Sequence, residues 1–124
     1  MMFLATGYFN AEKMNEKTEL EIDQFMATCE PYLNQFHASE QVLLDIGLEA
    51  SMKEIKRSSN QIKITDRQVA EPKEVMGSAF LIEALDMEDA IRIASLHPTV
   101  QVQEAEELGW RLEIRSIHYY RERD

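Results

Sequence analysis

Residues 65–85 read TDRQVAEPKEVMGSAFLIEAL and join a polar segment directly to an apolar one. The first half is charged and carries a single glycine, Gly77, after which residues 79–82 are continuously apolar. A short apolar run next to turn-forming residues is typical of a buried strand. The pattern predicts a solvated loop that ends at Gly77 and leads into a buried strand over residues 78–84.

In the rest of the chain, the spacing of apolar residues and the positions of turn-forming residues predict further elements. With this strand they make five strands and two helices. The first helix begins at Thr18, where Glu21 three residues later has capping-box spacing, and the second begins at Asp86, a good N-cap. Residues 51–59 are basic and polar without clean periodicity, and residues 99–110 form an acidic connection. The strands are predicted at residues 2–9, 42–49, 62–65, 78–84 and 112–117, and the helices at residues 18–36 and 86–96.

The resulting order, β-α-β-β-β-α-β, predicts an α+β fold of the ferredoxin-like plan with an extra strand or hairpin. In this plan two helices cover one face of a mainly antiparallel sheet. The strands at residues 2–9 and 79–82 are apolar on both faces, so the second face also needs a cover. The sequence therefore predicts a homodimer that packs sheet against sheet, built from a single domain over residues 1–124.

Composition narrows the classes of function. The chain has 124 residues, a net charge of −10 and one cysteine, Cys29, so an internal disulfide is impossible. The excess of acidic residues disfavours nucleic acid as a partner, because it would repel a phosphate backbone. The apolar start at residues 1–9 is too short for a membrane span and lacks the basic flank of a secretory signal. We expect a cytoplasmic protein without a membrane partner.

The same stretch resembles the hallmark segment of the YCII-related, or DGPF-domain, proteins, in which a T-D-G-P-F motif precedes A-E-x-K-E, a glycine-containing break and an apolar strand ending in I-E. LEIRSI at residues 112–117 is similar to the closing E-V-R-P motif of the family, and the likeness covers nearly the whole chain. The departures are Arg67, Gln68 and Val69 in place of G-P-F, and Ser116 in place of the final proline. The matching residues are Thr65, Asp66, Ala70, Glu71, Lys73, Glu74, Gly77, Leu81, Ile82, Glu83, Glu113 and Arg115.

The resemblance implies a dimeric α/β-barrel in which each ferredoxin-like monomer has a cleft between sheet and loops. The family is largely uncharacterised, and its YciI branch has been proposed as enzyme-like because of a His–Asp pair. The histidine of that branch, early in the first helix, has no counterpart between Thr18 and Phe36. Its aspartate before a proline falls at His97, so the pair cannot be carried over to this chain.

The candidate catalytic residues are Asp66, Glu71, His97 and Arg115, and the candidate ligand-binding residues are Asp66, Lys73 and Arg115. A carboxylate in a dry cleft could do acid–base work, and an arginine on a strand could bind a carboxylate through two hydrogen bonds. His97 is expected at the C-terminus of the second predicted helix, where the helix dipole favours the imidazolium.

Each candidate also has a purely structural interpretation: surface charge for the loop carboxylates and Lys73, an ion pair for Arg115, and helix capping for His97. The three histidines of the chain lack metal-ligand spacing, so no metal and no cofactor are predicted. Three functions stay open. The first is a small ligand-binding or regulatory dimer, the second is an enzyme of isomerase, lyase or monooxygenase-like type, and the third is a structural interaction dimer.

Overall fold

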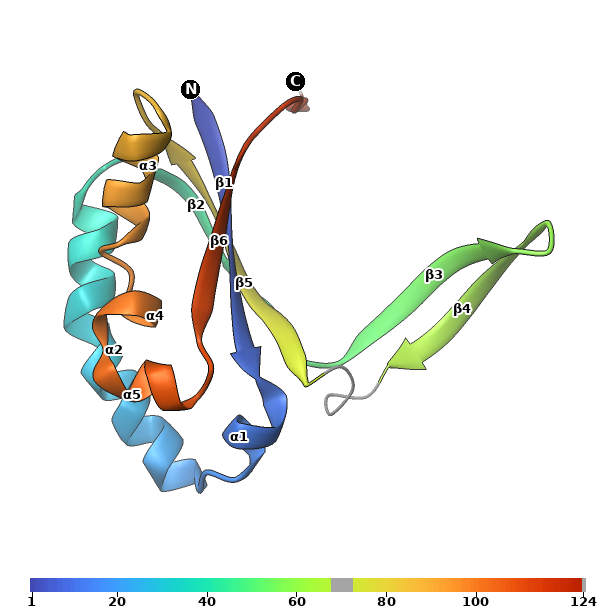
Figure 1. The fold of residues 1–124 in the computed structure, drawn as a ribbon, viewed down its shortest axis with the longest axis horizontal. Helices are drawn as coiled ribbons and strands as arrows, with labels where there is room; N and C mark the ends of the chain where they lie inside the picture. The colour runs from blue at the N-terminus through green and yellow to red at the C-terminus, as the bar shows by residue number, and fades with distance from the viewer. Residues whose placement is uncertain (68–72, 124) are drawn as a thin grey trace.

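The computed structural model describes residues 1–67 and 73–123, and its elements are shown in Figure 1. The strands are β1 (Met2–Asn10), β2 (Val42–Gly47), β3 (Met52–Ser58), β4 (Gln61–Arg67), β5 (Glu74–Glu83) and β6 (Arg111–Ser116). The helices are α1 (Ala11–Asn15), α2 (Glu19–Ala38), α3 (Met87–Ala94), α4 (Pro98–Gln101) and α5 (Gln103–Glu107).

The main sheet has the strand order β2-β5-β1-β6, and every neighbouring pair in it is antiparallel. Strands β1 and β5 are central, and β2 and β6 form the two edges. The β3–β4 pair forms a separate two-stranded sheet inserted between β2 and β5. The predicted ferredoxin-like α+β fold with an extra hairpin is confirmed.

The two long helices begin where the sequence predicts. Thr18 and Glu21 form a full capping box at the start of α2, with the hydroxyl of Thr18 accepting from the backbone N–H of Glu21 at 3.1 Å. The side chain of Asp86 accepts from the backbone N–H of Asp89 at 2.8 Å at the start of α3. These caps satisfy amide groups that have no partner within the helix. They fix both helix starts.

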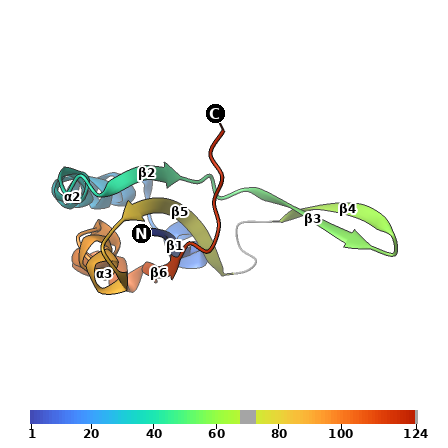
Figure 2. The same ribbon diagram turned by 90° about the horizontal axis from the view of Figure 1, so that it is seen from above.

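The helices lie on one face of the sheet, which we call the inner face (Figure 2). Between the two layers lies a core whose largest side chains are fully buried: Phe3, Phe36, Phe80, Ile82 and Ile93. The rings of Phe36 on α2 and Phe80 on β5 meet edge to face with centroids 4.8 Å apart. Each such side chain contributes about 1.5–3 kcal/mol through removal of apolar surface from water.

The opposite face of the main sheet, the open face, has no helix over it in the single chain (Figure 2). By strand register it carries Leu4, Leu44, Ile46 and Leu81, of which Leu4 is 39% exposed and Leu44 is 53% exposed. The predicted apolar character of both faces is therefore present. The homodimer that would cover the open face remains a prediction.

Three sequence expectations are wrong. Residues 51–59, which have no clean periodicity and no predicted strand, contain β3, in which no side chain is buried. Strand β5 begins at Glu74 instead of after Gly77, because β1 pairs with it as far as Asn10. The expected acidic connection at residues 99–110 contains most of α4 and all of α5, which are too short for a periodic pattern.

Candidate functional site

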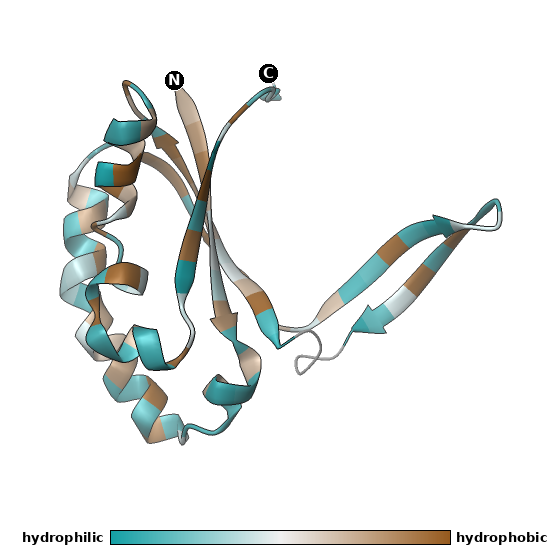
Figure 3. Ribbon diagram, viewed as in Figure 1, coloured by the Kyte–Doolittle hydropathy of each residue, from teal (hydrophilic) through white to brown (hydrophobic). Residues whose placement is uncertain are grey.

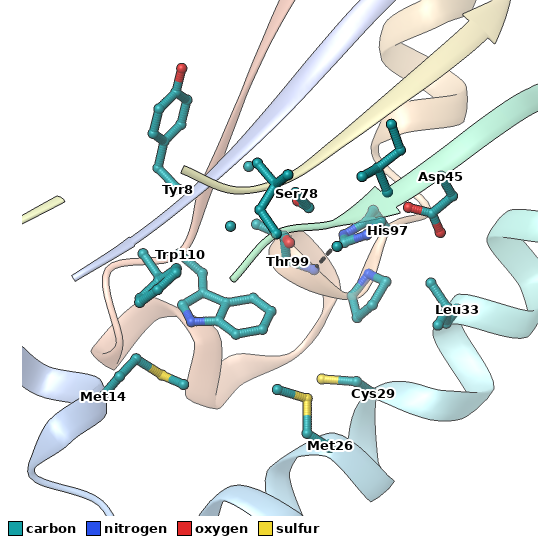
Figure 4. Close-up of a pocket in the computed structure, with 17 residues that line it drawn as sticks. Tyr8, Met14, Met26, Cys29, Leu33, Asp45, Ser78, His97, Thr99 and Trp110 are labelled. Atoms are coloured by element: carbon teal, nitrogen blue, oxygen red, sulfur yellow. Dashed lines mark hydrogen bonds between the residues drawn. The ribbon is translucent and has the colours of Figure 1, made fainter. Parts of the chain in front are cut away.

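A cavity of about 520 Å³ lies between the inner face of the sheet and helices α2 and α4 (Figure 4). Strands β1, β2 and β5 form its sheet wall, and Met26, Cys29 and Leu33 from α2 form part of the opposite wall. Trp110, just before β6, and His97, just before α4, also line it. This volume is in the range of small-molecule pockets in proteins.

Strand register explains why this part of the inner face is hollow. Gly47, Ser78 and Gly7 lie side by side across β2, β5 and β1. In the next row along the same strands, the central position is the buried Phe80. A row of three small residues leaves space that helix side chains do not fill. The cavity is therefore built into the pairing of the central strands.

The two glycines in this row differ in what surrounds them. A Cβ added at Gly7 would collide with Oγ of Ser78, so a larger residue there would force the Ser78 side chain to move. A Cβ added at Gly47 would meet no heavy atom within 4 Å. Gly47 thus borders open space, and a side chain placed there would enter the cavity.

His97 is the polar group held most firmly in the cavity wall. Its ring stacks on Phe80 with an interplanar angle of 14° and meets Phe36 edge to face, each with centroids 5.0 Å apart. Its Nδ1 accepts a hydrogen bond from the backbone N–H of Thr99 at 3.1 Å, which makes His97 the N-cap of α4. The side chain is 7% exposed.

The surroundings of His97 keep its imidazole neutral. Burial lowers its pKa to about 4, and the negative charge of Asp45 opposes this only in part. Because Nδ1 accepts from a backbone N–H, the single proton of the neutral ring is on Nε2. Nε2–H has no acceptor within the part of the chain that the structure describes. It is a hydrogen-bond donor available to a bound molecule.

The expectation of an imidazolium at a helix C-terminus is thus wrong for His97. Helix α3 ends at Ala94, and His97 caps the N-terminus of the next helix, where the dipole disfavours a positive charge. His97 does cap a helix, but it caps the N-terminus of α4 and not, as predicted, the C-terminus of the preceding helix.

A second histidine and a carboxylate lie at the edge of the cavity. Nε2 of His37, at the end of α2, is 2.7 Å from Oδ2 of Asp45 on β2. Asp45 lines the cavity and is paired across the strands with Phe80, the residue on which His97 stacks. Asp45 is the only acidic residue in the described wall of the cavity, and this wall contains no lysine or arginine.

Two further residues of the wall have special surroundings. Cys29 is 6% exposed, and burial, together with the negative charge of Glu104, raises the pKa of its thiol. The thiol therefore stays protonated and unreactive near neutral pH. Nε1 of Trp110 is a buried atom without a hydrogen-bond partner in the described chain.

The sequence-predicted site residues are not brought together. Asp66 lies on the hairpin and pairs with Lys53 at 3.0 Å, with its side chain 80% exposed. Lys73 is an exposed residue whose Nζ lies 3.7 Å from Glu12. Arg115 on β6 is paired with Leu4 and so lies on the open face. Of the candidates only His97 lines the cavity, and Glu71 lies outside the described residues.

Sequence reasoning missed Asp45, His37, Ser78 and Gly47 as residues at or beside the cavity. No local motif marks them, because they become neighbours only through strand register and the return of α2 onto the sheet. One weak signal for Asp45 was present in the sequence. Asp45 is the single charged residue between Val42 and Gly47, in a predicted strand that is otherwise apolar there.

Residues 1–67 and 73–123 contain neither a metal-binding cluster nor a membrane-spanning helix. No cluster of three or more histidine, cysteine, aspartate or glutamate side chains there is arranged to hold a metal ion. No helix in this part of the chain is long and apolar enough to cross a membrane.

The fold and the cavity define a ferredoxin-like α+β protein with a ligand-sized hollow under its helices. The chain belongs to the YCII-related domain family, whose model matches residues 1–109. No curated protein matches it in sequence. Among solved structures it is similar to a 5-chloro-2-hydroxyhydroquinone dehydrochlorinase from Burkholderia phenoliruptrix, in complex with 2,5-dihydroxybenzoquinone. The two share 14% identity over 97% of this chain and 96% of the other, with a TM-score of 0.48. At these values the likeness says nothing about what this chain binds.

Proposed function

We propose that this YCII-related protein is a small cytoplasmic homodimer that binds an uncharged small molecule in the cavity between the sheet and α2. The observation that carries the proposal is a ligand-sized, largely apolar hollow with a neutral histidine fixed in its wall. Binding sites of this kind combine apolar walls with a few polar groups that orient the ligand.

The charge of the wall selects the class of ligand. An anionic ligand would meet Asp45 and no lysine or arginine among the described residues of the wall. A charged group taken from water into an apolar site needs a partner of opposite sign, because its desolvation is costly. An uncharged molecule with an apolar body avoids this cost.

One end of the ligand needs a hydrogen-bond acceptor. Nε2–H of His97 is a donor without an acceptor in the described chain, and the Ser78 side chain lies nearby on the sheet wall. A carbonyl or hydroxyl oxygen on the ligand would accept a hydrogen bond from this donor. The ligand we expect is therefore apolar with one polar end.

The dimeric part of the proposal has its own support. Leu4, Leu44, Ile46 and Met76 on the open face are between 37% and 53% exposed. An apolar sheet face of this kind is stabilised when a second copy covers it. The cavity opens on the other face of the sheet, so binding of the ligand does not depend on this contact.

A second candidate function, an enzyme of isomerase or lyase type, is favoured by the position of His97 near Asp45. A neutral imidazole N–H can stabilise negative charge that develops on a substrate oxygen, and a carboxylate can accept a proton. In that case the bound molecule is a substrate. The residues that bind it are the same.

The test is a thermal-shift screen of uncharged, anionic and cationic small molecules against the wild type and a series at Gly47. The substitutions Gly47→Ala, Gly47→Val and Gly47→Phe add increasing volume at a site where a Cβ meets no neighbour. We expect uncharged compounds to raise the melting temperature of the wild type. Their affinity should fall stepwise across the series and be lost in Gly47→Phe.

Leu44→Val serves as the matched control, because it changes the same strand on the open face. Its affinity for the same compounds should equal that of the wild type. Stabilisation by anionic compounds alone, or hits whose affinity is the same in Gly47→Phe, would contradict the proposal. For a hit that is converted, His97→Asn should lower turnover more than binding if the enzyme interpretation is correct.

A further inference from the structure

The β3–β4 hairpin projects away from the rest of the molecule (Figures 1 and 2). Its strands pair from Met52 with Arg67 to Ser58 with Gln61, and Ser59 and Asn60 form the turn with positive φ values of 51° and 64°. A turn with two residues in this conformation matches the twist of a two-residue hairpin. The hairpin is therefore a regular element.

One face of the hairpin is apolar at its centre. Ile55 lies directly opposite Ile64, and Ile62 lies two residues along the same strand, so all three are on one face, the isoleucine face. Their exposures are 69%, 74% and 62% for Ile55, Ile62 and Ile64. Figure 3 shows these apolar bands on both strands of the projecting hairpin.

The side chains available to hold the hairpin on its own are weak stabilisers. Lys53 pairs with Asp66 at 3.0 Å and Arg67 with Glu54 at 3.4 Å, all with exposed or half-exposed side chains. Exposed ion pairs contribute about 0–1 kcal/mol, and a lone two-stranded hairpin is marginally stable in water. The three exposed isoleucines add little to this, because a cross-strand pair such as Ile55 and Ile64 contributes about 0.2–1 kcal/mol. Three large apolar side chains on one exposed face are expected if another protein surface covers that face.

The charge of the hairpin indicates which surface that is. Residues 52–67 carry five basic and two acidic side chains, a net charge of +3, in a chain whose total charge is −10. The remainder of the chain is therefore strongly acidic. A basic arm on an acidic body is complementary to the body of another copy. By strand register Lys53 and Arg57 lie on the isoleucine face, whereas Lys56, Lys63 and Arg67 lie on the other face of the hairpin.

The direction of the hairpin agrees with this. It extends on the side of the sheet opposite the helices, away from the open face (Figure 2). A second sheet packed on the open face would lie next to the hairpin. An arm in this position can reach around such a partner.

We propose that the β3–β4 hairpin is an exchange arm that packs its isoleucine face on the body of a second copy of this chain. The proposal rests on the homodimer part of the proposed function and is independent of the cavity. Each subunit would give one arm and receive one, which is the two-fold arrangement expected of a symmetric dimer. Nucleic acid is the competing occupant of a basic hairpin, but the acidic body would repel its phosphates.

The test uses zero-length carbodiimide cross-linking, which joins an amine to a carboxylate in direct contact. Unlabelled and ¹⁵N-labelled wild-type protein are mixed, allowed to exchange, cross-linked and digested. We expect mixed-isotope peptides that join Lys53 of one copy, which lies on the isoleucine face, to acidic residues of the body of the other. Cross-links of Lys53 only within one isotope, in a sample that is dimeric, would overturn the proposal.

A matched pair of triple variants measures the contribution of the isoleucine face. Ile55→Thr/Ile62→Thr/Ile64→Thr keeps strand-forming residues and should raise the dimer dissociation constant at least tenfold in analytical ultracentrifugation. Leu85→Thr/Ile91→Thr/Val100→Thr removes as many exposed apolar side chains from the helix-covered side of the body and should change it less than twofold.

Equal effects of the two triple variants would overturn the proposal, as would a monomeric wild type. Tight binding of a DNA or RNA duplex that is lost in Lys56→Gln/Lys63→Gln would also overturn it, in favour of nucleic acid. If the wild type is monomeric but still binds uncharged compounds in the thermal-shift screen, the exchange arm and the homodimer are both wrong. The proposed binding function of the cavity would then still stand.

Discussion

The main sheet and the β3–β4 hairpin are both antiparallel and both carry isoleucines, yet these side chains lie in opposite environments. Ile82 on β5 is completely buried under the helices, whereas Ile62 on β4 is 74% exposed. The main sheet is stabilised by packing between layers, and the hairpin only by pairing between its strands. The difference shows that two regular antiparallel ladders of one chain can differ completely in how much apolar surface they bury.

The same difference predicts where single substitutions will cost stability. Phe36→Ala or Phe80→Ala should lower the free energy of unfolding by about 3–5 kcal/mol, because each leaves a cavity in the core. Ile64→Ala on the hairpin should lower it by less than about 0.5 kcal/mol when the protein is measured as a monomer. Urea denaturation at a concentration below the dimer dissociation constant checks this, and equal losses at the two places would contradict the comparison.

The free energy of unfolding should also depend on pH, through His97 in the core between the main sheet and the helices. The pKa of His97 is lowered from 6.5 to about 4 in the folded protein, so below pH 6.5 the unfolded chain binds a proton that the folded chain does not. Stability should therefore fall between pH 6.5 and pH 4, by about 3 kcal/mol in total.

The control for this prediction is His97→Asn, which keeps an N-cap acceptor for the Thr99 amide but does not titrate. Urea denaturation of both proteins across this pH range should show the loss in the wild type and a flatter curve in the variant. Parallel curves would show that His97 titrates normally in the folded state.

A smaller effect is expected from the cap of α2. Thr18→Ala removes the hydroxyl that accepts from the Glu21 amide, which should lower the free energy of unfolding by about 1 kcal/mol. Thr18→Ser keeps the acceptor and should stay close to the wild type. Thermal unfolding of the two variants side by side measures the difference, and equal melting temperatures would mean that the capping box is not formed in solution.

The smallest effect should come from the ion pair of the hairpin. Asp66→Asn breaks the contact with Lys53, whose side chain is 69% exposed, and should change the free energy of unfolding by less than about 0.5 kcal/mol. It should also leave binding in the cavity unchanged. A loss of binding in Asp66→Asn would restore the sequence-based candidate and contradict the position of the site.

The fold could be predicted from the sequence where burial leaves a pattern. The caps of α2 and α3 and the apolar strands β1 and β5 follow from local residues and from the core they face. Strand β3 could not be predicted, because none of its residues is buried in the core and its sequence therefore has no regular apolar and polar alternation.

The candidate site could be predicted only in part. His97 stood out because it precedes a proline, but its neutral state depends on Phe80 and Phe36, which reach it from distant parts of the chain. The hollow itself depends on Gly7, Gly47 and Ser78 lying in one row, and strand register of this kind is not written in any local motif. The candidates Asp66, Glu71 and Lys73 were chosen because residues 65–74 are densely polar, and this property says nothing about their distance from the cavity.

The most direct test of a cavity site is ¹⁵N NMR of the His97 side chain during titration with an uncharged compound from the thermal-shift screen. At pH 7 we expect a neutral ring with its proton on Nε2, and a large shift of that Nε2–H signal as the compound binds. A His97 ring that is protonated at pH 6, or an Nε2–H signal that does not move at saturation with a stabilising compound, would contradict this expectation.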